Sequence, residues 1–488
     1  MKRPWAIALA IGFTACAAAL AVGRWVLLDF PGSADEFAYL WQAEAMADGH
    51  LTGEVIEPAD AFVTFHFGVV DGRRYARFPP GWPALLSLGV MAGWPGIVNP
   101  LLGAAALACL YLWARAFVGD RAALVGTLLT LSSPFFLLNA GSYHSHISCF
   151  LALVAAGLCL DVAWWRAPAP GRRLSGLLAL AAGTALGMAA AIRPYTALLL
   201  GGPLVVGPLL GRDASRRTRV IRLLPLVVLG ALPGLVAYAL VNRALTGDPF
   251  LPATQLLDPA EGVGFGVHGH SPRQGLQNTL LWLVEAFAYT FFLSPLLLFA
   301  ARRPSADKAR STLLWLLLFM LPLGYFFYWN PGGFRYGPRF WLEGLIAFAP
   351  LIGIGFLRTW ALPSRRILIY FGIGMGLIVL GKQLSDAHTK AFERSALYRA
   401  VEDAGLDHAV VLLLSGVADM PFWDLTRNPP EWRTQPVLYG RGRGVLDKDV
   451  ARAHPQRRLF YYRWDESGGR LFPADLDHPE PGVAMPDR

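Results

Sequence analysis

Charged residues are scarce in this sequence of 488 residues, of which only 16% are Asp, Glu, Lys or Arg. Ordinary globular domains carry roughly 25% charged residues. Hydrophobic residues make up 55% of the chain and the mean hydropathy is +0.42, so the sequence has too few polar groups to cover a water-facing surface. The composition therefore excludes a soluble enzyme and a disordered protein. It favours a chain whose bulk lies in lipid.

Cysteine is also scarce. The four cysteines all lie within apolar runs, and their spacing matches no metal-ligand pattern. Because burial in a membrane disfavours disulfide formation, the sequence excludes a disulfide scaffold and does not support redox chemistry.

Long apolar runs dominate the sequence. A transmembrane helix needs roughly 20 predominantly apolar residues. About eleven runs meet this requirement: 5–28, 97–116, 122–142, 145–165, 174–192, 194–211, 223–242, 277–301, 311–329, 340–357 and 367–382. The uncharged core of the first run is longer than that of a usual signal peptide, so we expect an uncleaved span. The segment 81–96 is short and contains two prolines, and we expect it to be a re-entrant or surface helix.

Basic residues indicate the orientation of these spans. With eleven spans, the short loops on one side hold more than twice as many Lys and Arg residues as those on the other. The positive-inside rule places the richer side, and with it the N-terminus, in the cytoplasm. A net charge of +9 would suggest nucleic acid in a soluble protein. Here the positive charge is explained by the Lys and Arg residues of the loops on the cytoplasmic side, and we expect no nucleic-acid partner.

Three outer segments are too large to be simple connections. The first outer loop, 29–96, is rich in acidic residues, and we expect it to form surface helices. The second, 243–276, could form a lid over a site at the membrane face. The tail, 383–488, alternates helix-like and strand-like stretches, which predicts a small periplasmic α/β domain. The expected organisation is thus a polytopic α-helical membrane module, 1–382, followed by that domain.

Two adjacent carboxylates, Asp35 and Glu36, come soon after the first span. Apolar residues follow at helical spacing, so both carboxylates should lie at the start of an amphipathic surface helix. A helix N-terminus stabilises a carboxylate as an anion. An ionised Asp at the membrane face suits a general base that removes a proton from an acceptor hydroxyl or amine. The alternative is that Ser33 or Asp35 caps the helix.

Polar and basic residues form two further groups at the outer ends of the spans. His144 and His146 lie in a short outer turn, where they could bind a divalent metal, donate to a phosphate or cap helix ends. Arginine pairs bidentately with phosphate oxygens, so arginines at the outer rim suit a lipid phosphate. The alternatives for the arginines are snorkelling at the interface and an internal pair between Arg339 and Glu343. The residues expected to bind substrate are His144, His146, Arg193, Arg335, Tyr336 and Arg339.

The order of these features resembles the GT-C type membrane glycosyltransferases, the superfamily of protein O-mannosyltransferases and aminoarabinose transferases. The resemblance extends over nearly the whole chain and looks like a bacterial branch of that class. It rests on the stretches DEFAY (35–39), FPPGWP (78–83), RPYTAL (193–198), NRALTGDPF (242–250) and YGPRFWLE (336–343).

The resemblance implies a sugar donor linked to polyprenyl phosphate and used at the outer face of the bacterial cytoplasmic membrane. It implies an inverting single displacement onto an envelope lipid, glycan or protein, with Asp35 as general base and Glu36 beside it. Arg335 and Arg339 would hold the donor phosphate, where cations stabilise the leaving group. Metal use is left open.

Two other functions remain as alternatives. A transporter or flippase of a lipid-linked saccharide would typically show internal repeats and charges at matching depths in both halves. The sequence has no evident repeat, and its polar candidates gather at one face, which favours an enzyme. A polymerase or ligase of surface polysaccharide would use the same kind of lipid-linked donor, and these motifs do not distinguish it from a glycosyltransferase that adds a single sugar.

Overall fold

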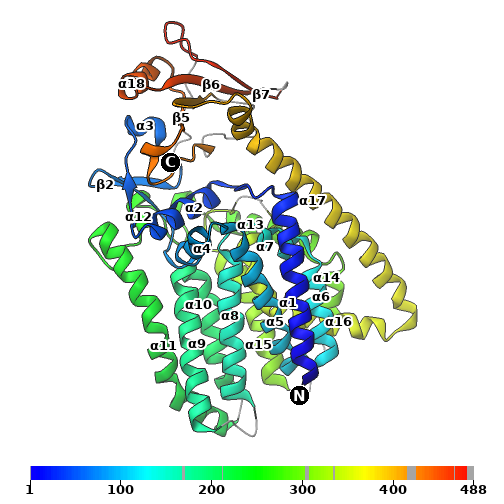
Figure 1. Cartoon of the computed structure of the whole chain (residues 1–488). Helices are drawn as coiled ribbons and strands as arrows, with labels where there is room; N and C mark the ends of the chain where they lie inside the picture. The colour runs from blue at the N-terminus through cyan, green and yellow to red at the C-terminus, as the bar shows by residue number, and fades with distance from the viewer. Residues whose placement is uncertain are drawn as a thin grey trace.

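The computed structural model of the chain describes residues 2–166, 171–210, 213–302, 307–332, 336–414, 425–465 and 468–480. Long apolar helices form a bundle, and short helices and strands form a layer over one end of it (Figure 1). The N-terminus lies at the opposite end of the bundle.

Seven helical segments of the described chain are long and apolar enough to cross a membrane, which identifies a multi-pass membrane protein. They are α1 (Lys2–Ala21) with η1 (Val22–Val26), η2 (Pro95–Ile97) with α5 (Val98–Val118), α8 (His146–Leu160) with η3 (Asp161–Trp165), α9 (Arg172–Ile192), α11 (Ala214–Thr246), η6 (Arg339–Gly344) with α16 (Leu345–Trp360), and η7 (Pro363–Arg365) with α17 (Arg366–Asp403). Each coincides with a predicted span.

Two predicted spans, 122–142 and 277–301, are bent rather than straight. The first consists of α6 (Asp120–Leu131) and α7 (Pro134–Gly141), at 60° to each other. The second consists of α13 (Pro272–Tyr289) and α14 (Ser294–Ala301), at 97°. A proline near the start of the second helix of each pair lacks the N–H that would continue the preceding helix.

The remaining two predicted spans are also helical, as α10 (Pro194–Val206) with η4 (Gly207–Leu210) and as α15 (Lys308–Tyr325). Counting each bent pair as one span gives at most nine candidates in the described chain, so the number eleven stays a prediction. The segment expected not to span contains α4 (Gly81–Met91). Its 11 residues extend only about 16 Å at 1.5 Å per residue, which is too short for a hydrocarbon core of about 30 Å.

The first outer loop is folded. It contains the surface helices α2 (Ala34–Ala47) and α4, which pack on each other, and the short helix α3 (Ala59–Phe62). Its three strands form an antiparallel sheet in the order β1-β3-β2, from β1 (Gly53–Glu54), β2 (Phe67–Val70) and β3 (Arg73–Ala76). The second large outer loop contains α12 (Ala253–Leu257) and the short turn η5 (Val267–Gly269).

The tail forms a four-stranded sheet in the order β5-β4-β6-β7. The strands are β4 (Ala409–Leu413), β5 (Val437–Arg441), β6 (Arg458–Asp465) and β7 (Gly468–Pro473), accompanied by α18 (Asp447–Ala453). Strand-like stretches were predicted in this tail, and β4 is parallel to both of its neighbours. The helix α17 continues unbroken to Asp403, so the expected domain boundary at 382 falls within a helix.

The tail and the first outer loop share hydrophobic cores. Phe37 packs in one cluster with Val411, and Phe62 packs in another with Leu412. Arg74 of β3 also donates to the backbone carbonyl of Asn428 at 2.7 Å. The two segments, far apart in sequence, therefore form one layer over the end of the bundle (Figure 1).

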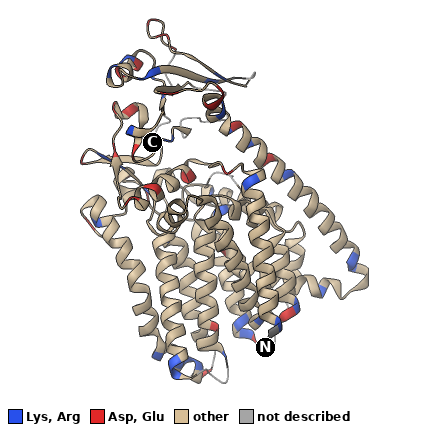
Figure 2. Cartoon of the chain, in the orientation of Figure 1, with Lys and Arg blue, Asp and Glu red and all other residues tan. Residues whose placement is uncertain are grey.

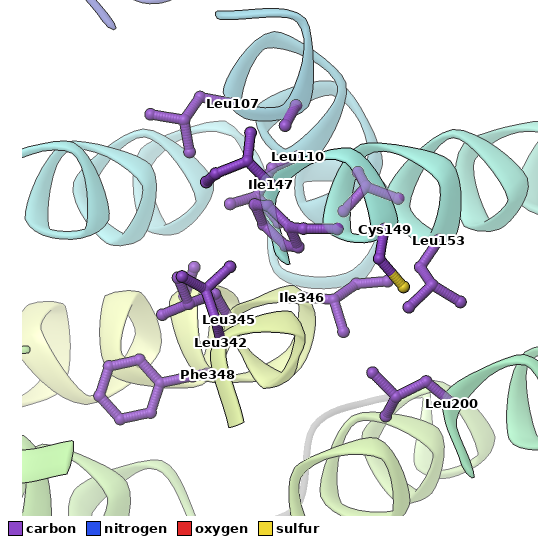
Figure 3. Close-up of a cluster of buried hydrophobic side chains, with 14 of the residues drawn as sticks. Leu107, Leu110, Ile147, Cys149, Leu153, Leu200, Leu342, Leu345, Ile346 and Phe348 are labelled. Carbon is purple, nitrogen blue, oxygen red and sulfur yellow. The ribbon is translucent and has the colours of Figure 1, made fainter. Parts of the chain in front are cut away.

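The bundle itself packs closely around buried aliphatic side chains. Leu107, Ile147 and Ile346 lie in a core shared by α5, α8 and α16 (Figure 3). A Cβ added at Gly126 would overlap the carbonyl of Ala349, so glycine is what allows α6 to approach α16. This packing holds the helix ends that carry the site in fixed relative positions.

Basic side chains gather at the end of the bundle that holds the N-terminus (Figure 2). The opposite end carries the layer formed by the first outer loop and the tail. The two ends of the bundle are thus chemically different.

Candidate active site

A cavity of about 660 Å³ lies at the end of the bundle covered by the folded layer. Its wall combines the start of α2, the junction of α9 and α10, the end of α15 and the start of η6 with the two large outer loops. The polar side chains that face it include Asp35, His66, His144, His146, Arg193 and Arg339. Five of these six were predicted from the sequence, and His66 was not.

Asp35 lies in the first turn of α2, but it does not cap that helix. The cap is Ser33, whose hydroxyl accepts from the Glu36 backbone N–H at 3.4 Å. The Asp35 carboxylate is 17% exposed and has a partner on each oxygen. Arg339 Nη2 lies 2.5 Å from Oδ2, and His66 Nε2 lies 2.8 Å from Oδ1.

This environment keeps Asp35 ionised. Burial alone would raise the pKa of its carboxyl, but the Arg339 guanidinium and the hydrogen bond from His66 hold that pKa well below its usual range. The nearby phenol of Tyr39 behaves in the opposite way, because burial and the Asp35 charge raise its pKa to about 12. At neutral pH the site thus contains an ionised carboxylate that can accept a proton and a phenol that stays protonated.

Glu36 faces the protein interior and is fully buried. Its Oε1 accepts from the Gly32 N–H and the Ser33 hydroxyl, both at 3.1 Å, and its Oε2 accepts from the Tyr143 N–H at 3.0 Å. It is not among the residues that line the cavity in the described chain. Its contacts are those of a side chain that fixes α2 against the turn before α8.

His144 connects this carboxylate to the arginine of the site. Its Nε2 lies 3.2 Å from Glu36 Oε1 and 3.4 Å from Arg339 Nη1. His146, at the start of α8, instead contacts Glu343, with Nδ1 3.3 Å from Oε1. The two imidazoles therefore face different carboxylates, although both line the cavity.

Arg193 and Glu343 form a second buried pair. Arg193 Nε lies 3.3 Å from Glu343 Oε1, and Arg193 Nη2 donates to the Tyr325 hydroxyl at 3.2 Å. The alternative of an Arg339–Glu343 pair was wrong, because Arg339 pairs with Asp35 instead. The physical reason is that η6 is a 3-10 helix, in which residues i and i+4 do not share a face.

Two other predicted residues are placed differently. Tyr336 is buried behind the cavity, where its carbonyl accepts from Asn139 at 3.2 Å and its ring packs 5.7 Å from that of His144. Its hydroxyl lies so close to Gly32 that a Cβ at that glycine would overlap it. Arg335 lies outside the described residues.

The second outer loop supplies the opposite wall of the cavity. Asp258, Glu261 and His268 have donor atoms within 4.8 Å of one another, which makes them the group of the described chain that could hold a metal ion. Each already has a protein partner. His268 Nε2 lies 3.0 Å from Asp258 Oδ2, and Arg77 Nη2 lies 2.7 Å from Glu261 Oε2. The guanidinium would oppose a cation at this carboxylate.

No protein-family model matches the sequence, and no curated protein matches it either. Solved structures do. ArnT from Cupriavidus metallidurans, bound to undecaprenyl phosphate, superposes with a TM-score of 0.58 over 95% of this chain and 93% of that chain, at 15% identity. An oligosaccharyltransferase from Archaeoglobus fulgidus, in complex with zinc and sulfate, gives 0.51 over 92% of this chain and 67% of that one, at 14% identity.

The chain has the GT-C fold. At this level of identity the likeness establishes the fold and leaves the activity to be argued from the site. The fold implied by the GT-C resemblance of the sequence is therefore confirmed. His66 is a residue of this cavity that no local motif indicated, because it comes far along the first outer loop from Asp35.

Proposed function

We propose that this protein is an inverting glycosyltransferase that moves a sugar from a polyprenyl-phosphate donor to an envelope acceptor. The observation that carries the proposal is the contact between the Asp35 carboxylate and the Arg339 guanidinium inside one cavity. A base and a phosphate-binding cation side by side are what a single displacement at a sugar phosphate requires. The structure of ArnT bound to undecaprenyl phosphate supports the choice of lipid carrier.

In the proposed reaction, an acceptor hydroxyl or amine attacks the anomeric carbon of the sugar. The acceptor gives its proton to Asp35, and the bond between the anomeric carbon and the phosphate oxygen breaks. The phosphate leaves with that electron pair, and Arg339 and Arg193 stabilise the charge it gains. His144 contacts both Glu36 and Arg339, and these contacts keep Asp35, next to Glu36 in the chain, and Arg339 in fixed relative positions.

The proposal also assigns the sides of the membrane. Because the basic end of the bundle carries the N-terminus, the N-terminus is cytoplasmic under the positive-inside rule (Figure 2). The site and the C-terminal sheet then lie at the outer face of the bacterial cytoplasmic membrane. This is where a sugar would be transferred to an envelope lipid, glycan or protein.

Mass spectrometry of cells with and without the Asp35→Asn variant tests the function. The polyprenyl-phosphate sugar used by the enzyme should accumulate in the variant, and one envelope glycan, lipid or protein should lose that sugar. Identical lipid-linked sugars and identical envelope glycans in both strains would refute the proposal.

A further inference from the structure

A histidine that the sequence did not indicate contacts the proposed base directly. We propose that His66 is a positioning residue, whose Nε2–H donates to Asp35 Oδ1 and directs the remaining lone pairs of the carboxylate toward the acceptor. The proposal rests on the function proposed above and deepens it. The contact measures 2.8 Å, and both side chains line the cavity.

The fold of the first outer loop sets the orientation of His66. In the hairpin of β2 and β3, Phe67 pairs with Ala76, and the ladder continues as Arg77 N–H donates to the His66 carbonyl at 3.1 Å. The imidazole packs against two aromatic rings, with its centroid 4.7 Å from that of Phe65 and 4.9 Å from that of Phe78. These contacts limit the freedom of the imidazole to turn.

The surroundings of the second ring nitrogen, His66 Nδ1, indicate which nitrogen carries the hydrogen. His66 Nδ1 is buried and has no hydrogen-bond partner among the described residues. A proton on that atom would be a buried donor without an acceptor, which is unfavourable. The tautomer that fits the site carries its hydrogen on Nε2, toward Asp35.

The two partners of Asp35 have different roles in this scheme. Arg339 contacts Oδ2 and carries a full charge that also serves the donor phosphate. His66 contacts Oδ1 from the β2–β3 end of the same outer loop, and its other ring nitrogen has no hydrogen-bond partner among the described residues. When the guanidinium turns toward a phosphate, the imidazole keeps the carboxylate in place. His66 neither gains nor loses a proton in the transfer, since the acceptor proton goes to Asp35.

A pair of amide substitutions tests the role of His66. The amide nitrogen of Gln can reach the position of Nε2, whereas that of Asn is one methylene shorter and reaches only the position of Nδ1. We expect His66→Gln to stay within about fivefold of the wild-type kcat and His66→Asn to lose about 10- to 100-fold in kcat. The KM for the lipid donor should change little in either variant. The exposed His50 of the same loop provides the control, as His50→Asn.

The assay uses the full-length protein in lipid vesicles, with the lipid-linked sugar that accumulates in Asp35→Asn cells as donor. An unchanged kcat in His66→Asn, an equal loss in both amide variants, or a loss confined to the donor KM would overturn the positioning role. Those outcomes leave the proposed function intact as long as the wild type transfers sugar and Asp35→Asn does not. If the wild type transfers no sugar from a lipid donor, the function itself is wrong.

Discussion

Replacing Asp35 by Asn removes the proposed base and changes the site as little as any substitution can. In the wild type, Oδ2 accepts from Arg339 at 2.5 Å and Oδ1 accepts from His66 at 2.8 Å. An amide can keep its oxygen toward Arg339 and turn its NH₂ toward the imidazole. The imidazole then accepts only if its proton moves to the buried Nδ1, which has no acceptor. The lost charge-assisted hydrogen bond and the unpaired donor should each cost about 1–3 kcal/mol, and we expect the variant to fold.

The effect on the reaction should be larger. General base catalysis contributes roughly 10²- to 10⁴-fold to a rate, which corresponds to about 3–5 kcal/mol at about 1.4 kcal/mol per factor of ten. We expect kcat/KM to fall by that factor, while binding of the lipid donor persists because Arg339 is still present. The readout is the initial rate of sugar transfer in lipid vesicles, beside a thermal unfolding curve for each protein.

Asp48→Asn is the matched control, since Asp48 is an exposed carboxylate at the other end of the same helix α2. It should leave the rate unchanged. A transfer rate of Asp35→Asn within threefold of the wild type, at equal amounts of folded protein, would refute the assignment of Asp35 as the base.

Three further predictions follow from the same geometry. Arg339→Gln should lower kcat/KM for the lipid donor about 10- to 100-fold, as expected for a lost charge-assisted contact to phosphate; an unchanged dependence of rate on donor concentration would exclude phosphate binding. Gly32→Ala should cost about 1–3 kcal/mol of stability by overlap with the Tyr336 hydroxyl, and Tyr336→Phe in the same protein should restore part of it in thermal unfolding. The pKa of Asp35 is lowered in the folded state, so its ion pair stabilises the protein fully above the unfolded pKa of about 3.9. The difference in melting temperature between wild type and Asp35→Asn should thus be flat from neutral pH to about 5, and should shrink as the pH falls below about 4.

Local sequence patterns were enough to predict most helices and strand-like stretches in the tail. Apolar runs are long because a lipid-embedded backbone must satisfy its own hydrogen bonds, so each of these runs is helical. The bends at Pro134 and Pro295 were missed, since hydropathy reports composition and not direction. The continuation of α17 to Asp403 was missed because the helix persists after its apolar character ends.

The candidate site was predicted only in part. Asp35 stood out because a carboxylate at the start of an amphipathic helix has a local signature. His66 had none, since its role depends on the hairpin that brings it to Asp35. The pairing of Arg339 also depended on local backbone form, because an α-helix would have favoured Glu343 and the observed 3-10 helix does not.

Hydropathy and the distribution of charge were enough to predict that this protein spans a membrane, which end of its bundle is basic, and which residue types gather at the other end. Each of those properties depends only on the composition of short stretches of the chain, which can be read from the sequence directly. Which of the polar residues meet depends on the folded chain. Asp35 and His66 lie 31 positions apart in the first outer loop and Arg339 lies in η6, and their contacts exist because packed helices and a hairpin hold these parts of the chain against one another. The side chains that Asp35 can reach are therefore a property of the fold and not of any motif.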